Sequence, residues 1–270
     1  MDPHDSRPLA DADLERRFGG VERLYGAQGF ARLRAAHIVV VGLGGVGSWA
    51  AEALARSGVG HLTLIDLDHI AESNTNRQVQ ALGDTFGKAK VVAMAERLVA
   101  INPIVRVDCI EEFVTPENAA TLVPPCDAVL DCIDQVAPKA ALIAACHARK
   151  IAVYTSGAGG GRTDPTRIRS DDLARAEGDP LLAKVRYRLR RQHGFARERT
   201  GADGRTRVPK FAVTAVYSDE PVRGGNHGGA PLACAGYGSV VTVTASLGLA
   251  LASCAMRNLT ANAGDKHRSA

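Results

Sequence analysis

The feature that most constrains the fold is a short apolar run that leads without a break into a cluster of glycines. Residues 38–41 are Ile-Val-Val-Val, and Gly42-Leu43-Gly44-Gly45-Val46-Gly47 follows at once. A continuous apolar run is typical of a strand covered on both faces, and the alanine-rich segment 48–57 predicts a helix. In this setting the glycines at 42, 44, 45 and 47 predict a tight turn whose backbone touches a phosphate, since the helix N-terminus supplies free N–H groups.

The alternation of strand and helix continues beyond this turn. Helical periodicity predicts helices at 88–101 and 138–149, and short apolar runs predict further strands at 61–66, 106–110, 128–133 and 151–155. Strands that alternate with helices indicate an α/β protein with a Rossmann-like, doubly wound, mostly parallel sheet.

Changes in composition suggest how the chain is organised. The N-terminal helical segment is expected to break at Gly19-Gly20, and the C-terminal half contains a basic helix at 180–192 and one or two strands within 208–217. The polar C-terminus is expected to fray. The predicted segments are the N-terminal helical segment (1–36), the nucleotide-binding core (37–156), a C-terminal extension of the same domain for substrate binding and dimer contacts (157–259), and a flexible tail (260–270).

Residues 240–256 carry no charge, which leaves two interpretations open. The segment is 17 residues long, at the short end for a membrane span, and it contains four hydroxyl side chains. We therefore favour a buried helix over a membrane anchor.

Composition excludes several classes of protein. The 33 Lys and Arg against 29 Asp and Glu give a net charge of only +4, and 46% hydrophobic residues are ordinary for a globular chain. Aromatic residues make up 4%, which argues against a module that binds RNA mainly by base stacking. The six cysteines form no C-x-x-C pair and the N-terminus has no secretory signal, so we expect a cytoplasmic protein with reduced thiols.

The glycine turn alone does not separate NAD from ATP, and the residues that follow it favour ATP. Asp66 ends the second predicted strand and can accept hydrogen bonds from ribose hydroxyls. Cleavage of a triphosphate needs fixed positive charge at the departing pyrophosphate, which a nicotinamide enzyme does not. The candidate residues for this chemistry are Asp68, Asn74 for a phosphate or ribose oxygen, Arg77 and Lys90 for pyrophosphate charge, and Asp134 as a hard oxygen ligand of Mg²⁺.

These motifs, from about Arg16 to Thr155, resemble the ThiF/MoeB superfamily of ubiquitin-activating-enzyme-like adenylyltransferases. The resemblance rests on G-x-G-G-V-G, D-x-D, N-x-N-R-Q, G-x-A-K and the position of Asp134. It implies ATP, Mg²⁺, adenylylation of a carboxylate and a homodimer. It also implies that an N-terminal arginine, matched by Arg17, reaches across the dimer to the phosphates.

Within that superfamily the chain resembles the family of tRNA threonylcarbamoyladenosine dehydratases. That family implies ATP-dependent cyclisation of a modified adenosine beside the anticodon, by adenylylation of its threonyl carboxylate. It also suggests a cysteine-desulfurase system as a partner, and it leaves open a monovalent cation for which the sequence gives no ligands. The matching stretches are 17–26, 47–56, 134–139, 157–160, 179–186 and 234–238.

Three rival functions remain open on the sequence. The first is an adenylyltransferase for a ubiquitin-like sulfur carrier, which loses weight because its paired C-x-x-C zinc ligands are missing. The second is an NAD-dependent oxidoreductase, and the third is a non-catalytic docking module for tRNA or membrane.

Positive charge is concentrated in one part of the chain. Residues 180–210 contain ten Lys and Arg and two acids, a net +8, so the remainder carries −4. Such a segment is typical of phosphate-backbone binding, and it predicts tRNA contact. The candidates on the predicted helix are Lys184, Arg186, Arg188, Arg190 and Arg191.

Cys234 lies in a small-residue turn before the uncharged segment. It is either a reactive thiol near the nucleotide or a small packed residue, and we include it among the candidate catalytic residues. The chemistry itself does not require a covalent thiol, because the nucleophile belongs to the substrate.

Overall fold

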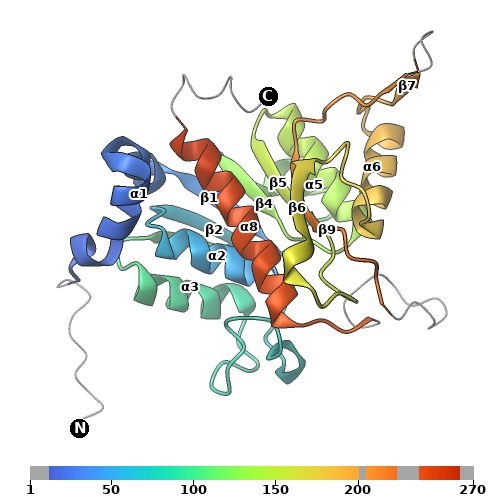
Figure 1. Ribbon diagram of the computed structural model, residues 1–270. Helices are drawn as coiled ribbons and strands as arrows, with labels where there is room; N and C mark the ends of the chain where they lie inside the picture. The colour runs from blue at the N-terminus through green and yellow to red at the C-terminus, as the bar shows by residue number, and fades with distance from the viewer. Residues whose placement is uncertain (1–11, 201–204, 224–236, 262–270) are drawn as a thin grey trace.

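The computed structural model describes residues 12–200, 205–223 and 237–261 (Figure 1). The helices are α1 (Leu14–Ala35), α2 (Gly47–Arg56), α3 (Lys90–Ile101), α4 (Ala119–Leu122), α5 (Val136–Ala148), α6 (Pro180–Gln192) and α8 (Val241–Thr260), with short 3₁₀ turns η2 (Glu72–Asn74) and η3 (Pro165–Arg167). The strands are β1 (His37–Val41), β2 (His61–Ile65), β3 (Arg106–Ile110), β4 (Ala128–Asp131), β5 (Ala152–Ser156), β6 (Ile168–Asp172), β7 (Arg199–Thr200), β8 (Thr206–Arg207) and β9 (Thr214–Ser218).

Seven strands form one sheet in the order β3-β2-β1-β4-β5-β9-β6. Strands β1 to β5 and β9 are parallel, and only the edge strand β6 runs antiparallel to its neighbour β9. The strand order reverses between β1 and β4, the place where open α/β sheets bind ligands. The predicted Rossmann-like, mostly parallel sheet is confirmed, and β9 and β6 extend that sheet rather than forming a second one.

Helices cover both faces of the sheet, with α2, α3 and α8 on one face and α5 and α6 on the other (Figure 1). Alternate residues of β1 show why its apolar run is continuous. Ile38 and Val40 pack in the cluster beneath α2 and α8, whereas Val39 and Val41 pack in the cluster with α5 and α6. A strand buried on both faces has no position for a polar side chain.

Helix α8 occupies the uncharged segment and lies across α2 and the sheet (Figure 1). Val243, Leu247 and Leu251 are fully buried in the same core as β1. No helix within the described ranges has the length and apolar character to cross a membrane. The buried-helix interpretation is therefore the one that the fold supports.

The predicted break at Gly19-Gly20 is wrong. Both glycines lie in regular helix, and α1 instead kinks at Gly26, where φ is 73° and ψ is 161°. A glycine pair weakens a helix without breaking it, while the buried Phe18 beside the pair holds this turn in place. The positive φ at Gly26 is a conformation that other residues rarely adopt.

Candidate active site

The glycine turn connects β1 to α2 at the carboxyl edge of the sheet. Gly42 has a φ of 85°, and a Cβ on Gly47 would overlap the Gly42 carbonyl oxygen, so glycine is required at both ends of the turn. The Gly42 N–H donates to Ile65 of β2 at 2.9 Å, which fixes the turn to the neighbouring strand. A Cβ on Gly44 would meet nothing within 4 Å. The turn therefore leaves open space beside its backbone at Gly44, as a phosphate site needs.

Asp66 is positioned by the glycine turn itself. Its carboxylate accepts hydrogen bonds from the Leu43 N–H at 2.6 Å and the Asp68 N–H at 2.8 Å. Burial raises the pKa of Asp66, while the nearby charge of Lys90 and these N–H groups act in the opposite direction. The structure thus brings Asp66 to the glycine turn, where the sequence predicts a ribose partner.

Asp68 and Lys90 form an ion pair at the same edge. The Lys90 Nζ lies 2.6 Å from Asp68 Oδ2, and the Lys90 N–H donates to the Asp68 carbonyl at 3.0 Å. The Lys90 side chain is buried and that of Asp68 is half exposed. Lys90 also begins α3, so its position is set by both a helix and a carboxylate.

Arg77 lies directly against the glycine turn. A Cβ on Gly45 would approach Arg77 Cγ to 3.0 Å, and the Arg77 guanidinium donates to the Ser73 carbonyl and to Asn76 Oδ1, both at 2.8 Å. Trp49 of α2 anchors this segment by donating its Nε1–H to the Arg77 carbonyl at 2.9 Å. The predicted pyrophosphate cation is therefore beside the predicted phosphate turn.

Asn74 has a partly structural role. Its Oδ1 accepts a hydrogen bond from the Ala71 N–H at 3.1 Å, which closes the η2 turn. Within the described residues its amide NH₂ donates to no partner, so only that group is left for a phosphate or ribose oxygen.

Asp134 follows β4 at the reversal of strand order and is exposed. No side chain of the described residues pairs with its carboxylate. An unpaired, exposed carboxylate at this edge fits a hard oxygen ligand for Mg²⁺.

A buried ion pair, which sequence reasoning missed, stabilises the segment between β4 and Asp134. Lys139 Nζ lies 3.0 Å from Asp131 Oδ2, and both side chains are fully buried. Lys139 also donates to the Ile133 carbonyl at 2.9 Å, and the Asp131 carboxylate accepts from Thr155 Oγ1 at 2.7 Å. Burial raises the pKa of Asp131, against the effect of the Lys139 charge. The pair holds the backbone that leads into Asp134.

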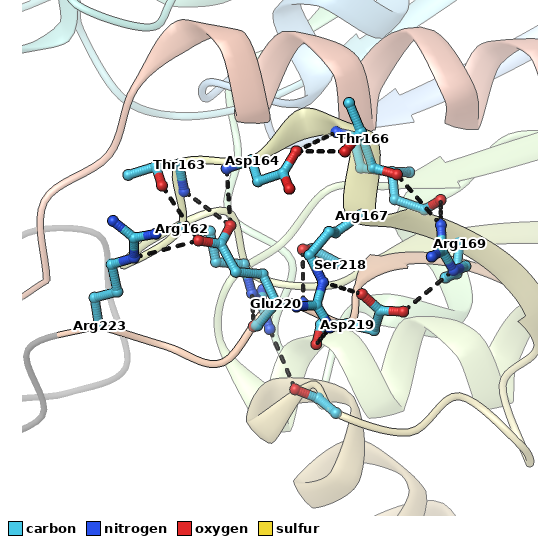
Figure 2. Close-up of polar contacts among 12 residues, drawn as sticks. Arg162, Thr163, Asp164, Thr166, Arg167, Arg169, Ser218, Asp219, Glu220 and Arg223 are labelled. Atoms are coloured by element: carbon cyan, nitrogen blue, oxygen red, sulfur yellow. Dashed lines mark hydrogen bonds and ion pairs between the residues drawn. The ribbon is translucent and has the colours of Figure 1, made fainter.

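A second buried network connects the segments that follow β5 and β9 (Figure 2). The Glu220 carboxylate accepts from the backbone N–H groups of Thr163 at 2.9 Å and Asp164 at 2.8 Å, and these donors lower its pKa. Arg162 donates to the Glu220 carbonyl at 3.1 Å, and its guanidinium lies 2.9 Å from Asp179 Oδ2, with both side chains fully buried.

Asp179 extends this network to α6. Its Oδ1 accepts from the Leu182 N–H at 2.9 Å, which caps the helix, and its Oδ2 accepts from the Ala158 N–H at 3.0 Å. A Cβ on Gly159 would approach Thr244 Cγ2 to 2.8 Å, and a Cβ on Gly45 would approach Thr244 Cβ to 3.1 Å. The glycine segment after β5 and the phosphate turn therefore pack against the same residue of α8.

Arg17 is exposed on α1, and its guanidinium donates to the Ala100 carbonyl at 3.1 Å and the Ile101 carbonyl at 2.8 Å. It thus caps the C-terminus of α3 within its own chain. Cys234 lies outside the described residues. The five cysteines in the described ranges are all free thiols, and burial raises the pKa of Cys132 and Cys146 to about 12.

The five basic candidates of α6 separate into two groups. Arg186 turns inward and donates to the Ala176 carbonyl, and Arg190 lies over the Phe211 ring and pairs with Glu198 at 3.0 Å. The other three line a cavity of about 410 Å³ on the surface of the helix: Lys184, Arg188 and Arg191.

The comparisons with known proteins agree with this geometry. A family model described as the ThiF family matches residues 20–269, which is most of the chain. The chain belongs to the ThiF family. Two relatives that it resembles over most of their length share one name.

The tRNA threonylcarbamoyladenosine dehydratase of Escherichia coli is 44% identical over 269 residues, covering 94% of this chain and 97% of that protein. The enzyme of the same name from Haemophilus influenzae is 46% identical over 243 residues, covering 87% of this chain and 90% of that protein. A crystal structure of the E. coli enzyme, TcdA, in complex with ATP superposes with a TM-score of 0.82 at 42% identity, covering 98% of this chain and 100% of that one.

Proposed function

We propose that this ThiF-family chain is an ATP-dependent tRNA threonylcarbamoyladenosine dehydratase that acts by adenylylating the threonyl carboxylate of its substrate. The observation that carries the proposal is the extent of the similarity. It covers the nucleotide core and also the C-terminal half with α6, at 44% identity to a dehydratase over 94% of this chain.

The first step activates a poor electrophile. A carboxylate oxygen of the threonylcarbamoyl group attacks the α-phosphorus of ATP, and the bond to pyrophosphate breaks. Arg77, which lies against the glycine turn, and Lys90, which pairs with Asp68 and whose charge acts on Asp66, stabilise the charge that accumulates on the leaving pyrophosphate. Asp66 holds the ribose, and the backbone of Gly44 and Gly45 lies against the phosphates.

The second step closes the ring. A nucleophilic atom of the neighbouring urea attacks the activated carbonyl carbon, and AMP departs with one of the original carboxylate oxygens. The urea group gives up one proton, so the nucleoside loses the elements of one water. The enzyme contributes mainly by orienting the two groups, which lowers the entropic part of the barrier.

Asp134 is the residue that would hold Mg²⁺, which supplies charge neutralisation on the phosphates when bound. The unpaired Asp134 carboxylate suits this role, and the buried Asp131–Lys139 pair fixes the backbone before it. Arg17 would complete the site of the partner subunit in a homodimer, which requires that it leave the α3 carbonyls that it caps in the single chain.

The rival functions have less support. A sulfur-carrier adenylyltransferase does not account for the cationic cavity of α6, and an NAD enzyme does not account for Arg77 beside the glycine turn together with Lys90 beside Asp68. The proposed substrate would place the enzyme in the cytoplasm. A cysteine-desulfurase partner and a monovalent cation stay predictions of the family resemblance.

Transfer of labelled oxygen tests the adenylylation step. Threonylcarbamoylated tRNA whose carboxylate carries heavy oxygen is incubated with ATP and the enzyme, and the nucleotide product is examined by mass spectrometry. We expect one heavy oxygen in AMP. Label that appears in inorganic phosphate, with ADP as the other product, would show that the γ-phosphate is transferred instead and would overturn adenylylation.

A further inference from the structure

The cavity on α6 has the composition of a nucleotide site rather than of a general basic surface. Its lining residues on the helix include three cations and one aromatic ring, and Val136 of α5 closes the other side. Lys184, Tyr187, Arg188 and Arg191 follow the spacing i, i+3, i+4 and i+7, so they form one stripe along α6.

Tyr187 is unusual because its ring is exposed and yet held in place. It is 61% exposed, more than any other aromatic side chain in the described residues. Arg191, one turn further along, lies with its guanidinium carbon 5.9 Å from the ring centroid and its Nη1 2.6 Å from the Tyr187 hydroxyl. A solvent-facing ring fixed by a cation offers a flat surface on which a base can stack.

The cations of the stripe differ from the other basic residues of α6. Arg186 and Arg190 are bound to the Ala176 carbonyl and to Glu198, so they support the helix. In the described part of the chain Lys184 and Arg188 have no carboxylate partner, which leaves both available to a phosphate. The cavity therefore presents a stacking surface and positive charge side by side.

The location of the cavity connects it to the chemistry. Val136 begins α5 and lies two residues after Asp134, at the edge of the sheet where the nucleotide site is formed. An RNA nucleotide held in the cavity would thus be close to the modified adenosine that reacts. RNA loops offer unstacked bases that proteins hold in this way.

We propose that this cavity binds one unstacked nucleotide of the anticodon loop next to the modified adenosine, with its base on Tyr187 and its phosphate on Lys184 and Arg188. The proposal rests on the proposed function, because it assumes a tRNA substrate. It revises the expectation from the low aromatic content that stacking has little part in binding.

The experiment is a double-mutant cycle between protein and RNA. An anticodon stem-loop that carries threonylcarbamoyladenosine is made with a single abasic position at each loop nucleotide in turn, and Kd is measured by fluorescence anisotropy. The variant is Tyr187→Leu. The controls are Tyr187→Phe, which keeps the ring, and Phe113→Leu, which removes a 51% exposed ring far along the chain from the cavity.

We expect Tyr187→Leu to weaken binding about 5- to 100-fold and both controls to stay within about twofold. One abasic position should weaken binding to the wild type but not to Tyr187→Leu. Tyr187→Leu should leave the salt dependence unchanged, whereas Arg188→Gln should reduce its slope by about one. Unchanged affinity of Tyr187→Leu, or equal losses from every abasic position in both proteins, would overturn the proposal.

Dehydration of full-length threonylcarbamoylated tRNA is measured on the same preparations. A wild type that dehydrates the tRNA but shows no coupling between Tyr187 and any abasic position refutes the cavity alone. A wild type that does not dehydrate the tRNA refutes the proposed function, and the nucleotide site falls with it.

Discussion

At the scale of single residues, the two cations proposed for pyrophosphate are held by different means. Lys90 is buried and paired with Asp68, so the position of its ammonium group is fixed before any nucleotide binds. Arg77 is less buried, lies against Gly45 and is bound mainly by backbone and amide oxygens. Because these hydrogen-bond acceptors are neutral, the Arg77 guanidinium loses little when it exchanges them for a phosphate. Arg77 is therefore suited to move toward the negative charge that develops on the leaving pyrophosphate.

Arg77→Ala is expected to lower kcat about 10²- to 10³-fold, because a positioned donor that acts on the leaving group is lost. Affinity for tRNA should change less than about twofold, since Arg77 lies at the glycine turn and not on α6. Steady-state kinetics and tRNA titration measure the two quantities, with Arg77→Lys as the variant that keeps the charge. Equal losses of kcat and tRNA affinity would remove Arg77 from the pyrophosphate site.

Asp179→Ala tests the buried network that sequence reasoning missed. It leaves the fully buried Arg162 without its carboxylate and α6 without its cap, so we expect the free energy of unfolding to fall by about 3–5 kcal/mol. Urea unfolding measures this loss. The control is Asp164→Ala, which removes a partly exposed carboxylate that caps only η3 and should cost much less. Similar losses in both variants would contradict the structural role of the Arg162–Asp179 pair.

At the scale of elements, α8 packs closely on the start of α2 and contacts the end of the glycine turn. A Cβ on Gly248 would overlap the Val46 carbonyl oxygen and come within 3.0 Å of the Ala50 nitrogen. Gly248→Ala is therefore expected to lower stability, because the overlap is with backbone and overpacking costs up to about 3 kcal/mol, against a gain of about 1 kcal/mol in helix propensity.

The same variant should weaken ATP binding, because Val46 belongs to the phosphate turn. Thermal unfolding and ATP titration check both effects, and Leu249→Ala on the exposed side of α8 serves as the control. A Gly248→Ala protein that is more stable than the wild type would show that the backbone contact is not tight.

The first two strands carry a pH-sensitive contact at their amino ends. The His37 and His61 rings stack with centroids 3.6 Å apart, and burial together with the His61 charge lowers the pKa of His37 below its usual 6.5. The unfolded chain therefore binds more protons than the folded one below about pH 6.5, so stability falls as the pH decreases through this range.

Unfolding by urea between pH 7.5 and 5.5 should show this loss in the wild type and a flatter dependence in His37→Asn. His69→Asn, a change at an exposed histidine, should keep the wild-type slope. A slope that is unaffected by His37→Asn would assign the pH dependence to other groups.

Most elements follow from local sequence, because their periodicity is strong. The strands of the core and α6 lie within a few residues of their predicted ranges, whereas β6 and the β7–β8 hairpin were not predicted. Strand β6, Ile168–Asp172, has exposed polar residues and is a strand only because β9 pairs with it at the sheet edge. Pairing between distant segments leaves little trace in a local pattern.

The site shows the same division. Asp66, Arg77 and Lys90 could be chosen from the sequence because motif spacing and strand ends place them at one edge. Arg162, Asp179 and Glu220 could not, since they come from three segments that only the folded sheet brings together. The charge pattern indicates a basic helix at α6, but it does not show that the Arg186 side chain points inward to the Ala176 carbonyl.

At the scale of the whole molecule, one sheet edge serves both proposed substrates. The glycine turn, Asp66 and Asp134 follow parallel strands whose carboxyl ends meet there, and the Arg162–Asp179 network connects the same edge to α6. The nucleotide and the RNA would thus be bound by elements of one continuous sheet.

The most direct test of this account is mass spectrometry of nucleosides from threonylcarbamoylated tRNA after incubation with the protein, with and without ATP and Mg²⁺. We expect the modified adenosine to lose the mass of one water only when ATP is present. An unchanged nucleoside from a protein that still binds ATP would contradict the proposed function. It would indicate that the core adenylylates a carboxylate on a carrier protein instead.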